Sequence, residues 1–149
     1  MRILYTLIIG MIAISALAED ANIFVKYDKE RVRKGSSLFS RQYKPTFLEV
    51  PNEFEDTHLT LRECYLEPRE VYPDLKFKVK KEGLVYILIG SKKIDDFSAK
   101  GWVKVAEGYY GDPADTKKRA AYSILSKHHE IGEHSLPGLD SIGTRLVIK

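Results

Sequence analysis

The chain has 149 residues, of which 24 are basic and 21 acidic, so its net charge is +3 at neutral pH. So small a positive excess does not predict a nucleic-acid or membrane-surface partner, because both need a concentrated basic face. Cys64 is the single cysteine, so the chain forms no internal disulfide and its stability must come from packing.

The first 18 residues have the order of a secretory signal peptide. Arg2 supplies a positive charge, an apolar run follows, and the small residues Ala16 and Ala18 end it. The alternative is a transmembrane helix, but the run is short for a span of about 20 residues and polar residues follow at once. We expect cleavage after residue 18, location in the periplasm or the medium, one domain over 19–149 and no integral membrane segment.

In the remaining chain, apolar residues recur mainly at every second position, which is the spacing of a strand with one buried face. Gly, Pro, Asp and Asn bound most of these segments. Many short strands at even spacing predict an all-β fold, here a single antiparallel, jelly-roll-like β-sandwich with at most one or two short helices. The expected strands are 23–27, 37–43, 46–50, 58–65, 75–80, 84–89, 102–106, 121–127 and 145–148.

The clearest strands are 75–80 and 84–89. In the first, Leu75, Phe77 and Val79 alternate with three lysines, which predicts one buried and one exposed face. In the second, both alternating sets are apolar, which predicts a central strand covered on both faces. With the turn at 81–83 between them, the two segments are expected to pair as a hairpin.

Helical signals are short. The best candidate is 94–100, ended by Gly101, which can take the left-handed conformation of a helix cap. The segment 112–118 is expected to be a helical turn or a loop. The charged stretch 28–35 is expected to be a solvated connection between strands.

Three histidines, His128, His129 and His134, lie within seven residues. The helical zinc-protease motif needs two histidines four apart, but position 133 is a glutamate, so the register is wrong. A zinc site on a hairpin, completed by a distant ligand such as His58, is one alternative. A solvated, polar strand end is the interpretation that we favour.

Other catalytic and cofactor motifs do not support an enzyme. The sequence contains no Gly-x-Ser-x-Gly elbow, glycine-rich phosphate loop or dinucleotide fingerprint, so we expect no cofactor. Asp112 and Asp115 could bind calcium, but a turn in which Asp bonds to the backbone two residues on is favoured. Cys64 could be a nucleophile, and we favour a small buried apolar residue instead.

The aromatic residues suggest a binding function. Sugar rings pack their C–H faces on Tyr and Trp while nearby polar groups bond to their hydroxyls. Tyr109 and Tyr110 are the leading candidates, followed by Tyr65 and Tyr72 and then by Trp102. The alternative is that the tyrosines cover the rim of the core and that Trp102 anchors it, and for Trp102 this alternative is favoured.

Strand and turn segments recur from about Leu38 to the end of the chain. They are LFSRQY at 38–43, VP at 50–51, GLVYIL at 83–88, GW at 101–102 and GTRLVI at 143–148. These segments resemble a family of small β-sandwich modules in secreted bacterial proteins that accompany sialidase-like and other carbohydrate-active domains. The resemblance implies a β-sandwich in a glycan-rich setting and no catalytic residue. Such modules usually adjoin an enzyme, whereas here the expected signal peptide leads almost directly into the module.

Three functions are compatible with these observations. The first is an exported, non-catalytic protein that binds a polysaccharide or another glycan through exposed aromatic residues. The second is an interaction or structural protein of the cell envelope that joins another polypeptide at an exposed strand edge. The third is a small metal-dependent hydrolase that uses the histidines.

Overall fold

The computed structural model describes residues 19–27, 29–38, 45–61, 73–138 and 143–149. The strands are β1 (Asn22–Phe24), β2 (Lys29–Arg31), β3 (Thr46–Glu49), β4 (His58–Thr60), β5 (Leu75–Lys81), β6 (Gly83–Gly90), β7 (Val103–Gly111), β8 (Arg119–His129), β9 (Gly132–Leu136) and β10 (Arg145–Ile148). The helical segments are η1 (Asn52–Phe54), η2 (Ser91–Lys93) and α2 (Ile94–Ser98).

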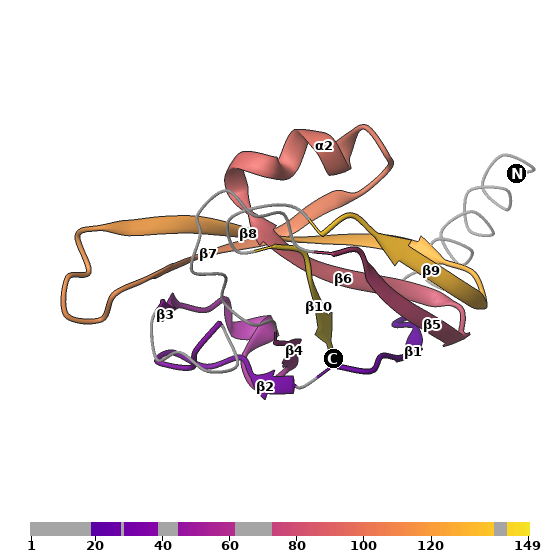
Figure 1. The fold of residues 1–149 in the computed structure, drawn as a ribbon, viewed down its shortest axis with the longest axis horizontal. Coiled ribbons are helices and arrows are strands. Elements are labelled where there is room, and N and C mark those ends of the chain that lie inside the picture. The colour runs from indigo at the N-terminus through magenta and orange to yellow at the C-terminus, as the bar shows by residue number, and fades with distance from the viewer. Residues whose placement is uncertain (1–18, 28, 39–44, 62–72, 139–142) are drawn as a thin grey trace, which may run out of the picture.

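These strands form two sheets, and all the pairings between them are antiparallel (Figure 1). The larger sheet has seven strands in the order β2-β4-β10-β6-β8-β7-β3, and the smaller has three in the order β1-β5-β9. The predicted all-β, sandwich-like fold is confirmed.

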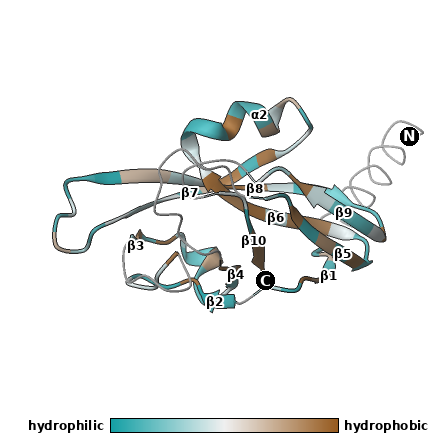
Figure 2. Ribbon diagram, viewed as in Figure 1, coloured by the Kyte–Doolittle hydropathy of each residue, from teal (hydrophilic) through white to brown (hydrophobic). Residues whose placement is uncertain are grey.

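Two apolar clusters cover the two faces of the larger sheet. The first lies between the sheets and joins Phe77 of β5 to Val85 and Ile87 of β6. The second lies on the opposite face and contains Leu88 and Tyr122. Because alternate residues of β6 enter different clusters, this strand is covered on both faces, as its sequence predicts. In Figure 2 the apolar stretches gather in the middle of the molecule, whereas the projecting end of the β7–β8 hairpin is largely hydrophilic.

The predicted hairpin of 75–80 with 84–89 is wrong, although both segments are strands. β5 pairs with β1 and β9, whereas β6 pairs with β8 and β10, so the two strands belong to different sheets. The chain passes from one sheet to the other between Lys81 and Gly83. The local turn signal was read correctly, but partners from distant parts of the sequence occupy both edges of each strand.

The corner between β5 and β6 is closed by the segment that follows residue 18. The Leu84 N–H donates to the Glu19 carbonyl over 2.8 Å, and the Ala21 N–H donates to the Leu84 carbonyl over 3.0 Å. This segment passes so close to Gly83 that a Cβ there would lie 2.6 Å from the Glu19 carbonyl oxygen. The close approach therefore requires glycine at this position.

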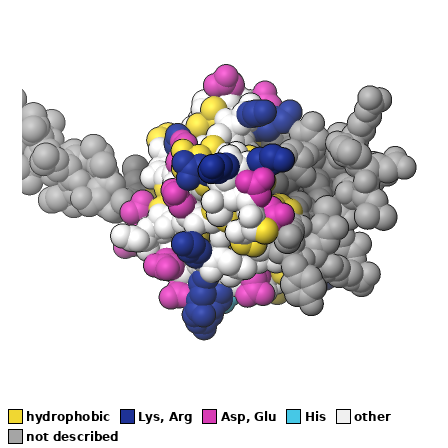
Figure 3. All heavy atoms as spheres, turned by 90° about the vertical axis from the view of Figure 1, so that its left-hand side faces the viewer, with side chains coloured by type: hydrophobic (Ala, Val, Ile, Leu, Met, Phe, Trp, Pro, Cys, Tyr) yellow, Lys and Arg dark blue, Asp and Glu magenta, His cyan; other side chains and the backbone are white. Residues whose placement is uncertain are grey.

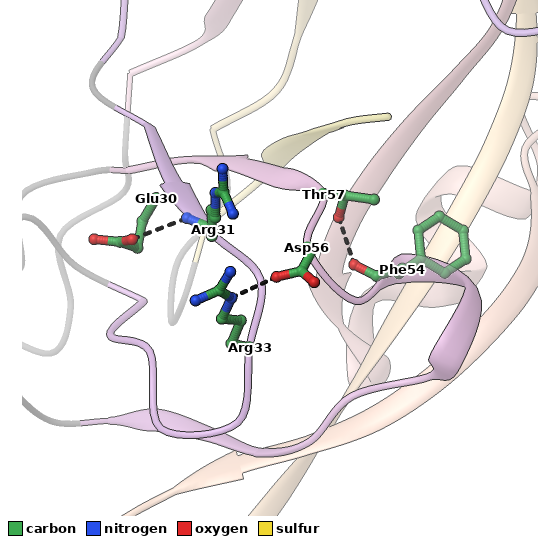
Figure 4. Close-up of polar contacts among 6 residues, drawn as sticks. All are labelled: Glu30, Arg31, Arg33, Phe54, Asp56 and Thr57. Carbon is green, nitrogen blue, oxygen red and sulfur yellow. Dashed lines mark hydrogen bonds and ion pairs between the residues drawn. The ribbon is translucent and has the colours of Figure 1, made fainter.

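The end of β2 and the start of β4 lie side by side, and the residues next to them are held together by polar contacts (Figure 4). Arg33 forms an ion pair with Asp56, and the Thr57 hydroxyl donates to the Phe54 carbonyl over 2.6 Å. Asp56 has a φ of 63°, a left-handed conformation that Asp tolerates better than most residues. The segment 28–35 was predicted to be a solvated connection between strands. That prediction is corrected, because Lys29–Arg31 is a strand paired with β4.

Several shorter predictions can be compared with the described residues. Helix α2 lies within the predicted 94–100, and Gly101 follows it with a φ of 90°. The Ala114 N–H donates to the Asp112 carboxylate over 2.8 Å, which confirms the predicted turn.

The expected signal peptide at 1–18 and Cys64 lie outside the described residues. None of the helices in the described part of the chain has the length and apolar character needed to cross a membrane.

Candidate ligand-binding groove

Tyr109 and Tyr110 are neighbours on β7, so their side chains lie on opposite faces of that strand. Tyr110 packs against the second apolar cluster. The Arg119 guanidinium lies 3.9 Å from the centre of the Tyr109 ring and also bonds to Glu49. Figure 3 shows the end of the molecule from which the β7–β8 hairpin projects, and basic and acidic side chains are interspersed there. The two tyrosines therefore do not form one shared platform.

The other predicted aromatic residues are placed differently. Trp102 is only 5% exposed and lies in the first apolar cluster beside Phe97, so it offers no ring face to solvent. Tyr65 and Tyr72 lie outside the described residues.

Two of the three histidines belong to a chain of ring contacts inside the sandwich. The His129 and His134 rings are 4.8 Å apart, and Trp102 lies 5.2 Å from His129. His134 also stacks on Phe77 with 5.6 Å between ring centres. His128, the neighbour of His129, instead lies 4.0 Å from Glu82. His129 and His134 are therefore half-buried, because both rings contact aromatic neighbours where β9 pairs with β5.

The surroundings of His129 favour its neutral form. Burial lowers its pKa, and the positive charges of neighbouring side chains add to that effect, against the opposing effect of its backbone hydrogen bond. That bond joins Nδ1 to the Lys127 carbonyl oxygen over 3.0 Å. Since a carbonyl oxygen only accepts, Nδ1 carries the proton. His134 is anchored in a similar way, because its Nε2 donates to the Glu130 carbonyl over 2.8 Å.

A metal centre needs at least three or four suitable ligands at one point. In the part of the chain that the structure describes, no three His, Cys, Asp or Glu side chains are grouped so that they could hold a metal ion. His129 and His134 make ring contacts with aromatic neighbours, and His128 points toward a different residue.

A groove of about 630 Å³ lies against the smaller sheet. Its middle is β5, one side is the segment that contains β1 and the residues after it, and the other side is β9. The lining residues are Phe24, Val25, Lys26, Tyr27, Lys76, Phe77, Lys78, Glu133, His134 and Ser135. The groove therefore combines aromatic rings with lysines, a carboxylate and a hydroxyl.

Strand register places several of these side chains in one row across the sheet. Lys78 of β5 lies opposite Phe24 of β1 and opposite Glu133 of β9. The next row on the same face contains Lys76 opposite Ser135, two positions along each strand. These five residues are all exposed, which agrees with their place on the outer face of the sheet.

The exposed side chains of this face are available for contact. Phe24 is 47% exposed, and the Lys80 ammonium lies 5.3 Å from its ring centre. The Lys80 side chain therefore packs against the Phe24 ring at the edge of the groove and places a positive charge there. Among the described residues, none forms an ion pair with Lys76 or Lys78.

The groove could not be predicted from the sequence, because β9 is not recognisable as a strand there. The alternation of Lys76 and Lys78 with buried residues was visible in the sequence. Glu133, His134 and Ser135 also alternate between exposed and half-buried positions, but few residues in this segment favour strands. Only its pairing with β5 brings the segment beside Phe24.

Comparisons of this chain with protein-family models, with curated proteins and with solved structures found no match. The function is therefore inferred from the residues of the groove.

Proposed function

We propose that this chain is an exported, non-catalytic protein that binds carbohydrate in the groove over β5. The observation that carries the proposal is the composition of the groove, where the exposed ring of Phe24 lies in a row with Lys78 and Glu133. An aromatic ring offers a flat apolar surface to the C–H face of a sugar. The lysine and carboxylate groups then bond to hydroxyls at the ring edge.

The shape of the groove favours an extended ligand. It crosses three strands, and neighbouring strands in a sheet lie about 4.8 Å apart, so the row from Phe24 to Glu133 spans roughly 10 Å. A volume of about 630 Å³ falls within the range typical of small-molecule sites. A short oligosaccharide laid across the sheet would contact aromatic and polar groups together.

The arrangement supports binding more than catalysis. Glu133 and His134 are neighbours on β9, so their side chains lie on opposite faces and cannot act together on one bond. His134 Nε2 is already bonded to the Glu130 carbonyl. General acid–base catalysis needs a group within hydrogen-bond reach of the reacting atom and free to transfer a proton.

Export is part of the same proposal, because the apolar run before residue 18 has the order of a signal peptide. The residues directly after it are already part of the fold, since Glu19 accepts the Leu84 N–H and forms an ion pair with Lys81. The mass of the protein recovered from the periplasm or the medium should therefore correspond to a chain that begins at Glu19. Recovery of the uncleaved chain from the cytosol would remove this part of the proposal.

The binding proposal is tested on a glycan array followed by calorimetric titration of the saccharides that bind. Phe24→Ala should weaken binding roughly two- to twelvefold, because aromatic stacking contributes about 0.5–1.5 kcal/mol. Phe24 is partly exposed, so thermal unfolding should show that the variant remains folded. Tyr109→Ala is the matched control, since it removes an aromatic ring from β7 and leaves the groove intact. If no saccharide binds, or if only Tyr109→Ala weakens binding, the proposal is wrong.

A further inference from the structure

The charges that line the groove are not balanced. Three lysines contribute to the lining, Lys26, Lys76 and Lys78, against the single carboxylate of Glu133. The whole chain has a net charge of only +3 over 149 residues, so this is a local concentration of positive charge. A neutral saccharide would not require it.

The two lysines of β5 are placed to act on the same ligand. Lys76 and Lys78 are two residues apart on one strand, so both point to the outer face and their Cα atoms are roughly 7 Å apart. Neither forms an ion pair with a described residue, although Lys78 lies opposite Glu133 in the register. Their ammonium groups are therefore available to a negatively charged group that lies along β5.

The aromatic ring of Phe24 and the ammonium groups of Lys76 and Lys78 lie in two adjacent rows across the smaller sheet. Phe24 lies directly opposite Lys78, so a sugar ring packed on the phenyl group would carry its ring substituents toward the lysines. Ser135, opposite Lys76, supplies a hydroxyl that can donate to or accept from the same substituent. A sugar with an anionic substituent could therefore pack its ring on Phe24 while the substituent contacts the lysines and the Ser135 hydroxyl.

From this charge complementarity we infer that the ligand of the groove is a saccharide that carries carboxylate groups, such as a chain of uronic acid residues. The inference rests on the proposed function and adds the chemical class of the ligand. The Lys76 and Lys78 ammonium groups pair with the carboxylates, the Phe24 ring packs on the sugar face, and Glu133 accepts a hydrogen bond from a sugar hydroxyl. No covalent step is involved.

The test compares two forms of one saccharide that differ only in charge. An oligogalacturonate and its fully methyl-esterified form are titrated calorimetrically into the protein at low and at high salt. The acid should bind about two- to thirtyfold more tightly than the ester at low salt, since each of the two exposed ion pairs contributes about 1.4- to 5-fold. The difference should shrink in 0.5 M salt, where the screening length is only about 4 Å.

Lys76→Gln combined with Lys78→Gln should weaken binding of the acid more than binding of the ester, so that the preference for the acid is lost. The control pair is Lys92→Gln with Lys117→Gln, which removes two exposed lysines that do not line the groove. This pair should keep the preference, which separates a local effect from a change in net charge.

The outcomes distinguish the inference from the proposed function. Equal affinity for acid and ester would overturn the inference and leave saccharide binding in place. A preference that survives Lys76→Gln with Lys78→Gln, or polyglutamate binding as tightly as the oligogalacturonate, would also overturn it. If neither form binds and no saccharide on the array binds, both the inference and the proposed function are wrong.

Discussion

At the scale of single residues, the most informative group outside the groove is His129. It is partly buried among Trp102, Phe77 and His134, and its Nδ1–H is directed at a backbone carbonyl. A second proton would have to enter an apolar environment beside another imidazole. The surroundings of His129 therefore favour its neutral form over its protonated form.

This environment predicts a dependence of stability on pH. The unfolded chain binds a proton at His129 near the ordinary pKa of about 6.5, whereas burial lowers the pKa of the folded form. Below about pH 6.5 the unfolded state therefore binds more protons, and the free energy of unfolding decreases as the pH falls. The urea midpoint should decrease between pH 7.5 and 5.5.

The contribution of His129 is separated from that of other groups by substitution. His129→Phe preserves an aromatic ring in the cluster but cannot be protonated, so its urea midpoint should change less over the same pH interval. His128→Gln, next to it on the strand, is the control and should follow the native protein. If His129→Phe shows the full pH effect of the native protein, the predicted role of burial is contradicted.

At the scale of elements, the corner between β5 and β6 explains how the two sheets are joined. The Leu84 backbone bonds to Glu19 and Ala21, and Gly83 leaves the space for this segment. A side chain at that position would collide with backbone atoms, which cannot move aside as the end of a long side chain can.

Gly83→Ala should therefore displace the segment 19–21 and lower the free energy of unfolding by about 1–3 kcal/mol. Amide hydrogen exchange should show faster exchange at Leu84. Gly132→Ala is a matched control, because Gly132 also has a positive φ, 140° against 156° at Gly83, but a Cβ there would meet nothing within 4 Å. Equal losses of stability in the two variants would mean that backbone strain alone is responsible.

The same scale shows what the sequence can predict. Strict alternation around Phe77 and the apolar run of β6 identified strands correctly, because side-chain periodicity reflects which faces are buried. The predicted pairing of these two strands was wrong, because neighbours in this fold come from distant parts of the chain and a turn signal does not reveal them. β9 was missed for a related reason, since its polar residues form a strand only against β5.

At the scale of the whole molecule, the groove exists only because of topology. Its residues come from three segments, 24–27, 76–78 and 133–135, which are separated by about fifty residues in each case. β5 lies between the other two strands of the smaller sheet and brings them together. The aromatic ring of Phe24 and the lysines at 76 and 78 could be read from the sequence, but their convergence with 133–135 could not.

The predicted tyrosine site shows the opposite situation. Tyr109 and Tyr110 are adjacent in sequence and were the leading candidates for sugar binding, but an extended strand directs them to opposite faces. The fold thus separates residues that are close in sequence and assembles others that are far apart. We accordingly place the proposed carbohydrate site on the smaller sheet.

The central claim is that a saccharide binds in the groove of the smaller sheet, and backbone amide chemical shifts measured during a titration test it most directly. With the oligogalacturonate as ligand, the largest shifts should occur at Phe24, Lys78 and Ser135 on β1, β5 and β9. Shifts confined to Tyr109 and Tyr110 on β7, or no shifts at saturating saccharide, would contradict the account.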